Sequence, residues 1–300
     1  MKQVLKLTKR NVILFFKDKG FFFVSLIIPV VLLLLYALFL GKVYQDSFIG
    51  ALGGFSVSKT LIDGFVGAQL CSSILSVTCV TVAFCSNMLM VQDKATGVYS
   101  DLAISPVKKE KLGFAYFLST ELTTLIIALS SALVTFIYLA FSGWYLSVFD
   151  MLLLLLDILL LTTMATLVSS IVSSFLSTQG QISAVGTLVS TGYGYISGAY
   201  MPLSQFSEGL RTALGFFPGT HATSLFRNHA LRGIWSEVQA QGVSAEVIAE
   251  LKKAFDCELY VFGAGMPLWV SYVVVIGSIA VFLLAYLLIM RKKNKSLINN

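Results

Sequence analysis

Six apolar runs, each long enough to cross a lipid bilayer, divide this sequence of 300 residues. A helix needs about 20 apolar residues to span the hydrocarbon core, where every backbone polar group must find a partner within the protein. The sequence therefore predicts an all-α membrane protein in which residues 1–300 form a single transmembrane domain. The six transmembrane helices are expected near residues 21–41, 64–90, 112–140, 149–176, 181–202 and 266–290.

The basic residues indicate which side of the membrane each end faces. Of the 21 Lys and Arg residues, six precede the first run, four lie between the second and third runs, four follow the last run, and seven lie elsewhere. Short loops rich in Lys and Arg stay on the cytoplasmic side. We expect a multi-pass protein of the plasma membrane with both termini and segment 91–112 in the cytoplasm. Because orientation accounts for the net charge of +6, no nucleic-acid partner is expected.

Residues 1–20 interleave six basic side chains with apolar ones. A helix here would be amphipathic and would lie in the headgroup plane on the cytoplasmic side before the chain turns into the membrane. A signal peptide is the alternative interpretation. It fits poorly, because the run Phe21 to Leu40 is long enough to span the bilayer and no small-residue cleavage site is present.

The segment Val91 to Leu112 is a charged stretch between two membrane-spanning runs, so it must lie in water. Within it, residues 97–104 can form a short helix that places Val98 and Leu102 on one face. Two interpretations are open. The segment is either an ordinary solvated loop or a docking element for a soluble partner that pushes on the membrane helices.

Two of the predicted spans carry stripes of small, weakly polar residues at helical spacing. They are Thr162, Thr166, Ser169, Ser170 and Ser173 on the fourth run and Ser183, Thr187, Ser190, Gly194 and Gly198 on the fifth. Small residues let helix backbones approach each other closely in a membrane, and we favour this packing role. A substrate path between the two helices is the alternative.

Three carboxylates lie in or at the edge of spans, namely Glu121, Asp150 and Asp157. A carboxylate in hydrocarbon is costly unless it faces protein or water or is protonated. Asp150 is near enough to the outer boundary to be interfacial. For Glu121 and Asp157 we favour structural hydrogen bonding, and a proton relay in a proton-driven secondary transporter is the alternative.

The region between the fifth and sixth runs, residues 203–265, has a different character. Pro202 and Pro218 bracket a segment that is too short and too polar to cross, so it should re-enter the membrane or lie on the outer face. The stretch Thr220 to Gly265 is expected to be an extracytoplasmic loop with one amphipathic helix. His221 and His229 have no clustered ligand partners in sequence, so we interpret them as polar loop residues and expect no metal site.

The sequence contains no phosphate-binding loop, nucleophile elbow or HExxH motif. No catalytic residue is therefore predicted. If the chain moves a solute uphill, the energy must come from an ion gradient or from a separate protein.

Three stretches in order resemble the permease subunits of type-2 ATP-binding-cassette (ABC) exporters. They are LTKRNVILFFKDKG before the first span, QDKATGVYSDLAISPVKKEKLGFAY between the second and third, and SGAYMPLSQFSEGLRTALGFFPGTHATSLFR before the last. The resemblance covers most of the chain. It departs at Asp93-Lys94, where the family often has Glu-Arg, and at Ser207-Glu208, where the family often has a further proline.

The resemblance implies that segment 91–112 is a coupling loop that docks on a separate cytoplasmic ABC ATPase, which would bind ATP and magnesium. This chain itself would bind no cofactor and would pair with a second, identical or similar, permease subunit within membrane lipid. The docking residues would be Asp93, Lys94, Val98, Tyr99, Asp101, Leu102 and Ile104. The substrate pathway would include Thr166, Ser170, Thr187, Ser190, Tyr193 and Gly194. The expected cargo is an exported amphipathic molecule, such as a drug, a lipid-like molecule or a peptide.

Overall fold

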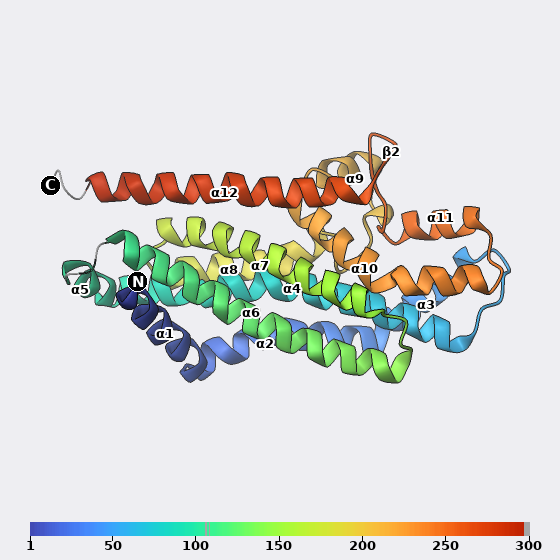
Figure 1. Ribbon diagram of the computed structural model, residues 1–300, viewed down its shortest axis with the longest axis horizontal. Coiled ribbons are helices and arrows are strands. Elements are labelled where there is room, and N and C mark those ends of the chain that lie inside the picture. Colours follow the sequence, from blue (N-terminus) through green and yellow to red (C-terminus); the bar gives the residue numbers. More distant parts are fainter. Residues whose placement is uncertain (106, 108, 297–300) are drawn as a thin grey trace.

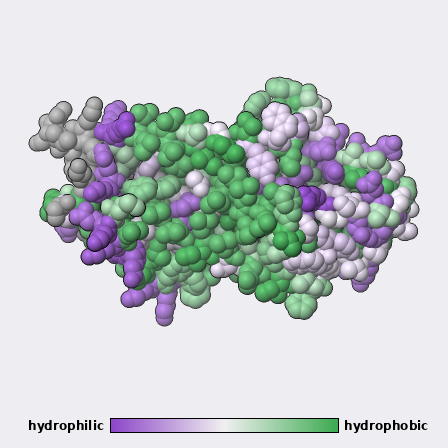
Figure 2. All heavy atoms as spheres, in the orientation of Figure 1, coloured by the Kyte–Doolittle hydropathy of each residue, from purple (hydrophilic) through white to green (hydrophobic). Residues whose placement is uncertain are grey.

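The long helices of the protein lie side by side along one axis, and short elements gather at the two ends of the bundle (Figure 1). The computed structural model describes residues 1–105, 107 and 109–296. The start of α1, the C-terminal end of α12 and α5 (Val98–Ile104) lie at one end of the bundle, and α9, α11 and the β-hairpin lie toward the other. On the face shown in Figure 2, a broad hydrophobic zone separates hydrophilic residues at the two ends.

Within the described residues, five helical segments are long and apolar enough to cross a membrane. The first of them is continuous from α2 through a π-helical turn into α3. The prediction of an all-α, multi-pass membrane protein is therefore confirmed. The segments belong to α2 (Lys19–Leu35), η1 (Tyr36–Leu40) and α3 (Gly41–Ala51), then α4 (Lys59–Ala95), α6 (Lys109–Ser142), α7 (Val148–Phe175) and α12 (Leu268–Ser296).

The fifth predicted span corresponds to α8 (Gln179–Ile196), which begins with a capping box formed by Thr178 and Gln181. This helix has 18 residues and is rich in Gly, Ser and Thr. It lies against α4 but does not share the apolar composition of the other five spans. Helices are thus present at all six predicted positions, and five of them have the character of membrane spans.

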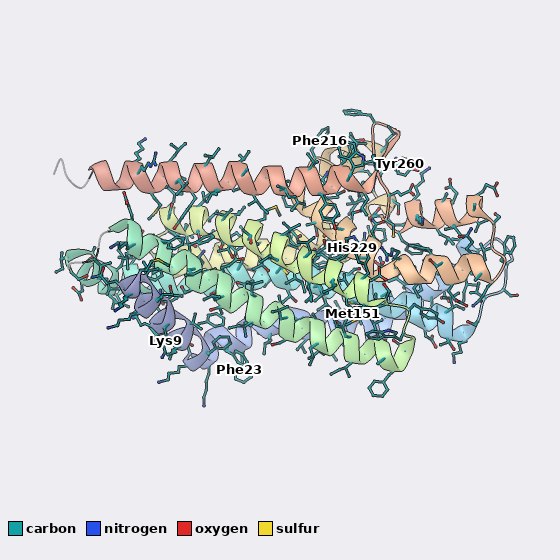
Figure 3. All side chains as sticks on the ribbon, viewed as in Figure 1. Lys9, Phe23, Met151, Phe216, His229 and Tyr260 are labelled. Carbon is teal, nitrogen blue, oxygen red and sulfur yellow. The ribbon has the colours of Figure 1, made fainter. Side chains whose placement is uncertain are left out.

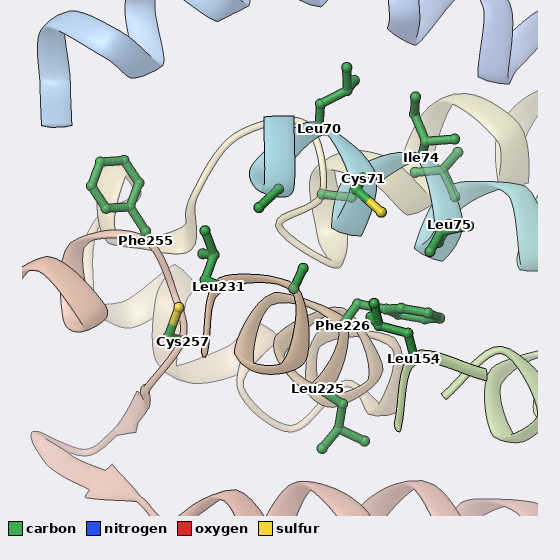
Figure 4. Packing of buried hydrophobic residues seen from close by; sticks show 14 of the residues in the cluster. Leu70, Cys71, Ile74, Leu75, Leu154, Leu225, Phe226, Leu231, Phe255 and Cys257 are labelled. Carbon is green, nitrogen blue, oxygen red and sulfur yellow. The ribbon is translucent and has the colours of Figure 1, made fainter. Parts of the chain in front are cut away.

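Helix α4 is the centre of the bundle. In its most apolar stretch 94% of the residues are buried, and it packs against α2, α6, α7, α8 and α10. Small residues allow this close packing, because a Cβ added at Gly67 would lie 2.9 Å from Leu139 and Ser142 of α6. Figure 4 shows Leu75 of α4 on the side that faces Phe226 of α10 and Leu154 of α7, and all three belong to one buried cluster.

The N-terminal helix predicted within residues 1–20 is present as α1 (Lys2–Lys17), and it packs against α6. Its buried residues recur every three or four positions, at Val4, Thr8, Asn11 and Phe15. The Asn11 amide donates a hydrogen bond to Ser119 of α6 at 3.4 Å. The basic residues of α1 that the pattern predicts for the other face are mostly exposed.

The segment between α8 and α12 corrects one expectation. Instead of a loop, the chain from Pro218 forms a 23-residue helix, α10, that packs between α4, α7 and α12. His221 and His229 are buried in this helix, with 2% and 3% of their surface exposed, and are not loop residues. The polar composition misled the prediction because both side chains have buried hydrogen-bond partners. Those of His221 are the Gly215 carbonyl at 2.8 Å and the Ser271 hydroxyl at 3.0 Å.

The other elements of this region are short. The segment bracketed by Pro202 and Pro218 folds into the 3-10 turn η2 and the helix α9, too short to span a membrane, as predicted. The amphipathic helix expected after Ser244 is α11, which the Ser244 side chain caps. Two strands then form an antiparallel hairpin in which Leu259 pairs with Met266. The bounds are η2 (Leu203–Gln205), α9 (Glu208–Leu214), α10 (Pro218–Ala240), α11 (Ala245–Ala254), β1 (Leu259–Val261) and β2 (Ala264–Met266).

Candidate functional site

Helix α5 projects from the end of the bundle that also holds the start of α1 and the C-terminal end of α12 (Figure 1). It begins after Gly97, whose φ of 85° lies in the left-handed region that favours glycine. Tyr99 and Leu102 are half-buried and pack on a small cluster around Leu112 and Tyr116 of α6. Ile104 is the opposite case, because 86% of its surface is exposed. The helix therefore has an anchored side and an exposed apolar tip.

The residues on the two sides of α5 differ in how far their side chains are exposed. Val98 is half-buried, and the side chain of Asp101 is exposed. Together with Ile104, Asp101 is a predicted docking residue that the fold leaves fully accessible. An accessible carboxylate next to an accessible branched apolar side chain is a surface that can contact another protein.

Asp93 lies at the base of α5 and is only 5% exposed. Its Oδ2 receives hydrogen bonds from Nη1 of Arg10 at 2.7 Å and from the Tyr116 hydroxyl at 2.5 Å. The carboxylate thus joins α4 to α1 and α6, and its hydrogen bond raises the pKa of Arg10. Asp93 is therefore not the surface contact that was predicted, because its side chain is buried and bonded to Arg10 and Tyr116.

Lys94 also makes internal contacts. Its Nζ donates hydrogen bonds to the carbonyl oxygens of Ser173 at 2.8 Å, Leu176 at 3.1 Å and Ser174 at 3.3 Å. These carbonyls lie at the C-terminal end of α7, where a helix leaves its last acceptors without backbone partners and where a cation is favoured. Lys94 therefore caps α7, a role other than the predicted surface contact. The neighbours Asp93 and Lys94 together connect the base of α5 with α1, α6 and α7.

Replacing Asp93 with Ala should destabilise the protein by about 1.5–3 kcal/mol, the range for hydrogen bonds to a charged group. The substitution removes the acceptor of Arg10 and Tyr116 and detaches α1 from α4. Thermal unfolding in mild detergent would measure the loss. Asp101→Ala is the matched control, because that carboxylate is exposed, and it should change stability by less than about 0.5 kcal/mol. Equal effects of the two substitutions would contradict a connecting role for Asp93.

The predicted pathway residues fall into two groups. Thr166, Ser170, Tyr193 and Gly194 are buried in contacts between helices. Ser170, for example, accepts a hydrogen bond from the Asn87 amide at 3.0 Å, and the Tyr193 hydroxyl lies 3.1 Å from that of Ser76. These four residues follow the packing interpretation of the polar stripes.

Thr187 and Ser190 belong to the second group, because they line cavities between α8 and α2. One cavity of about 610 Å³ contains both residues and extends to Asp18 and Gly20 at the turn between α1 and α2. A second cavity of about 780 Å³ extends along α2 and α3 to the opposite end of the bundle. Ser190 and Thr191 line both cavities, so the two lie in series along α8.

The three carboxylates of the spans have separate partners. Glu121 accepts a hydrogen bond from Thr163 at 2.9 Å, and Asp150 caps α7 through Ser147. Asp157 is buried and pairs with Nδ1 of His229 at 2.5 Å. These contacts favour structural hydrogen bonding for Glu121 and Asp157, as the sequence analysis did.

A buried ion pair that the sequence did not predict lies near the hairpin. Arg227 of α10 is fully buried, and its Nη1 lies 2.9 Å from Oδ2 of Asp256. Arg227 also donates to the Gly198 carbonyl, and Asp256 accepts from the Leu203 amide at 2.5 Å. The pair thus fastens the segment after α8 to α10 and to the turn after α11. Asp256 lies 29 residues from Arg227 along the chain, so no local pattern in the sequence indicates that the two pair.

Comparison with known families gives one match. The family model described as "ABC-2 type transporter" matches residues 2–230. This range covers about three quarters of the chain and includes α1, α5 and α8. No curated protein and no solved structure matches the chain.

Proposed function

Because the chain belongs to the ABC-2 type transporter family and is a membrane permease of that kind, we propose that α5 docks on a separate cytoplasmic ABC ATPase. The main support for this proposal is that α5 has exposed side chains at its tip, while the residues at its base are held by contacts with other helices. Ile104 and Asp101 are available to a partner, whereas Asp93 and Lys94 hold the helix to the bundle. If α5 faces the cytoplasm, both termini are cytoplasmic as well, which agrees with the distribution of basic residues in the sequence.

The contacts at the base of α5 determine which helices would move if a partner displaced α5. A displacement of α5 would act through Asp93 on Arg10 of α1 and on Tyr116 of α6. It would act through Lys94 on the last turn of α7. The ATPase, which would bind ATP and magnesium, would thereby move three helices through two adjacent residues of this chain.

The lining of the cavities along α8 supports an amphipathic cargo, and we propose that the protein exports it. Apart from Asp18, no charged residue among the described ones lines either cavity. Hydroxyl groups of Ser190 and Thr191 alternate with aromatic rings such as Tyr195 and Tyr200. Apolar walls with a few hydrogen-bonding groups suit drug-like or lipid-like molecules. A second permease subunit, identical or similar, would face α2 and α8 and close these cavities toward the membrane.

Transport assays in everted membrane vesicles test this function. Vesicles from cells that produce the chain with its ATPase should accumulate a fluorescent amphipathic dye when ATP is added, and a protonophore should not stop the uptake. Glu121→Gln should transport at the wild-type rate, because the amide oxygen still accepts the Thr163 hydrogen bond. Uptake that needs no ATP and disappears with the protonophore or with Glu121→Gln would instead indicate a proton-driven transporter.

A further inference from the structure

A third cavity lies at the end of the bundle opposite α5. Its volume is about 460 Å³, and it is formed between α7, α10, α11 and α12. Unlike the two cavities along α8, it is rich in polar and basic side chains. Its polar lining residues are Asn228, His229, Arg232, Ser236, Gln239, Lys252 and Tyr272.

The basic groups of this cavity retain donors that the protein does not use. Arg232 pairs with Asp150 through Nε at 2.8 Å, and its guanidinium lies 4.9 Å from the centre of the Phe149 ring. Among the described residues, its two Nη groups form no ion pair. In the described part of the chain, no carboxylate forms an ion pair with the half-buried Lys252. Arg232 and Gln239 are exposed at the rim, so the cavity is open to a ligand.

The floor of the cavity presents an imidazole and a phenol in place of a carboxylate. His229, labelled in Figure 3, is 97% buried, and its Nδ1 is bonded to Asp157. Its Nε2 lies 3.3 Å from the Tyr272 hydroxyl. Asp157 lies beyond the imidazole and is absent from the lining, so among the described residues no carboxylate lines the cavity.

The position of the cavity along the spans indicates its depth. Leu153 is in the second turn of α7, and Leu268 and Tyr272 are in the first two turns of α12, so the cavity lies near one end of both spans. Exposed aromatic rings of Phe149 and Trp269 occur at the same ends. Aromatic side chains of this kind mark the level of the lipid headgroups.

We propose that this cavity binds an oxyanion, either a phosphate or a carboxylate, carried by the headgroup of a membrane lipid. Such groups accept several hydrogen bonds at once, which matches the donor groups that Arg232, Lys252 and Gln239 bring to the lining. Basic pockets between transmembrane helices on the cytoplasmic side of membranes hold anionic headgroups, and this cavity has side chains of the same kind at the end opposite α5. The proposal requires only that α7 and α12 span the membrane, so it does not depend on the ATPase or on the cargo.

Native mass spectrometry of the purified full chain in mild detergent tests the site. Phosphatidylglycerol should bind about tenfold more tightly than phosphatidylcholine with the same acyl chains. Both headgroups contain a phosphate, but the choline cation of phosphatidylcholine offsets its negative charge and so weakens its attraction to Arg232 and Lys252. Lys252→Gln should remove most of this preference, and Lys252→Arg should restore it. Lys253→Gln is the matched control, because its ammonium lies 4.9 Å from the centre of the Tyr260 ring and outside the cavity.

A second pair of variants keeps the test valid if Lys252→Gln misfolds. Gln239→Glu adds a negative charge at the exposed rim and should weaken phosphatidylglycerol binding, whereas Ala240→Glu, next to it and outside the lining, should not. Competition by millimolar inorganic phosphate would assign the site to a soluble oxyanion, and its failure to compete would assign it to the headgroup. Equal binding of the two lipids, or equal effects within both variant pairs, would overturn the proposal.

Discussion

Arg227→Met is expected to reduce the folded protein to a small fraction of the wild-type yield. The guanidinium is fully buried, and its removal leaves Asp256, itself 5% exposed, without its counter-ion. Breaking a buried ion pair in this way costs about 3–5 kcal/mol, which is a large share of the 5–15 kcal/mol that usually stabilises a protein. Gel filtration in mild detergent and the thermal unfolding midpoint would measure the loss.

Two further variants separate the charge from the shape of the side chain. Lys59→Met removes an exposed cation at the start of α4 and should leave the midpoint nearly unchanged. Arg227→Met combined with Asp256→Asn should recover part of the stability, because no uncompensated charge remains. The asparagine oxygen can still accept the Leu203 amide, and asparagine tolerates the positive φ of 53° at this position. If Arg227→Met alone were as stable as the wild type, the ion pair between Arg227 and Asp256 would not stabilise this part of the protein.

Much of the fold follows from local patterns in the sequence. Apolar length alone predicted six spans, five of which have the length and composition of membrane-spanning helices, and the alternation of basic and apolar residues predicted α1. The glycine and the apolar spacing at Val98 and Leu102 predicted α5. These features depend on residues close together in the chain, which is why composition and periodicity reveal them.

The parts that the sequence did not predict depend on distant partners. α10 was taken for a loop because His229 and Arg227 are polar, yet their partners Asp157 and Asp256 lie 72 and 29 residues away. The resemblance to the permease family implies that Asp93 is a docking contact, but Arg10, 83 residues away, pairs with it inside the protein. No local pattern reports such pairings, since either partner alone looks like a solvated residue.

The pathway residues show a related limit. Ser190 and Gly194 are one turn apart on α8 and have the same small, weakly polar character. Ser190 nevertheless lines both cavities, whereas Gly194 packs against the ring of Tyr200. The size of the side chains on the neighbouring helices decides which turn of α8 meets a cavity. The spacing of small residues on α8 gives no information about those side chains.

Ile104→Asp should remove the ATPase from this protein without unfolding it. Ile104 is 86% exposed, so its substitution breaks no packing inside the chain. In contact with a partner, a buried isoleucine is worth about 1.5–3 kcal/mol, and an aspartate there would in addition bury a charge. Leu102 is less suitable for this test, because it is half-buried next to Leu112 and Tyr116 and its loss would also disturb the fold.

Phe262→Asp provides the matched control. Phe262 is also a large exposed apolar residue, 79% accessible, but it lies in the hairpin at the opposite end of the bundle. Its φ of 51° is one that aspartate adopts more readily than most residues. This variant should keep the ATPase, so the comparison separates the position of a new charge from the charge itself.

The most direct test is therefore the ATP hydrolysis that copurifies with equal amounts of folded wild type, Ile104→Asp and Phe262→Asp from mild detergent. The docking of an ATPase on α5 predicts similar activity with the wild type and Phe262→Asp, and at least a tenfold loss with Ile104→Asp. Undiminished activity with Ile104→Asp, or no activity with the wild type, would contradict it.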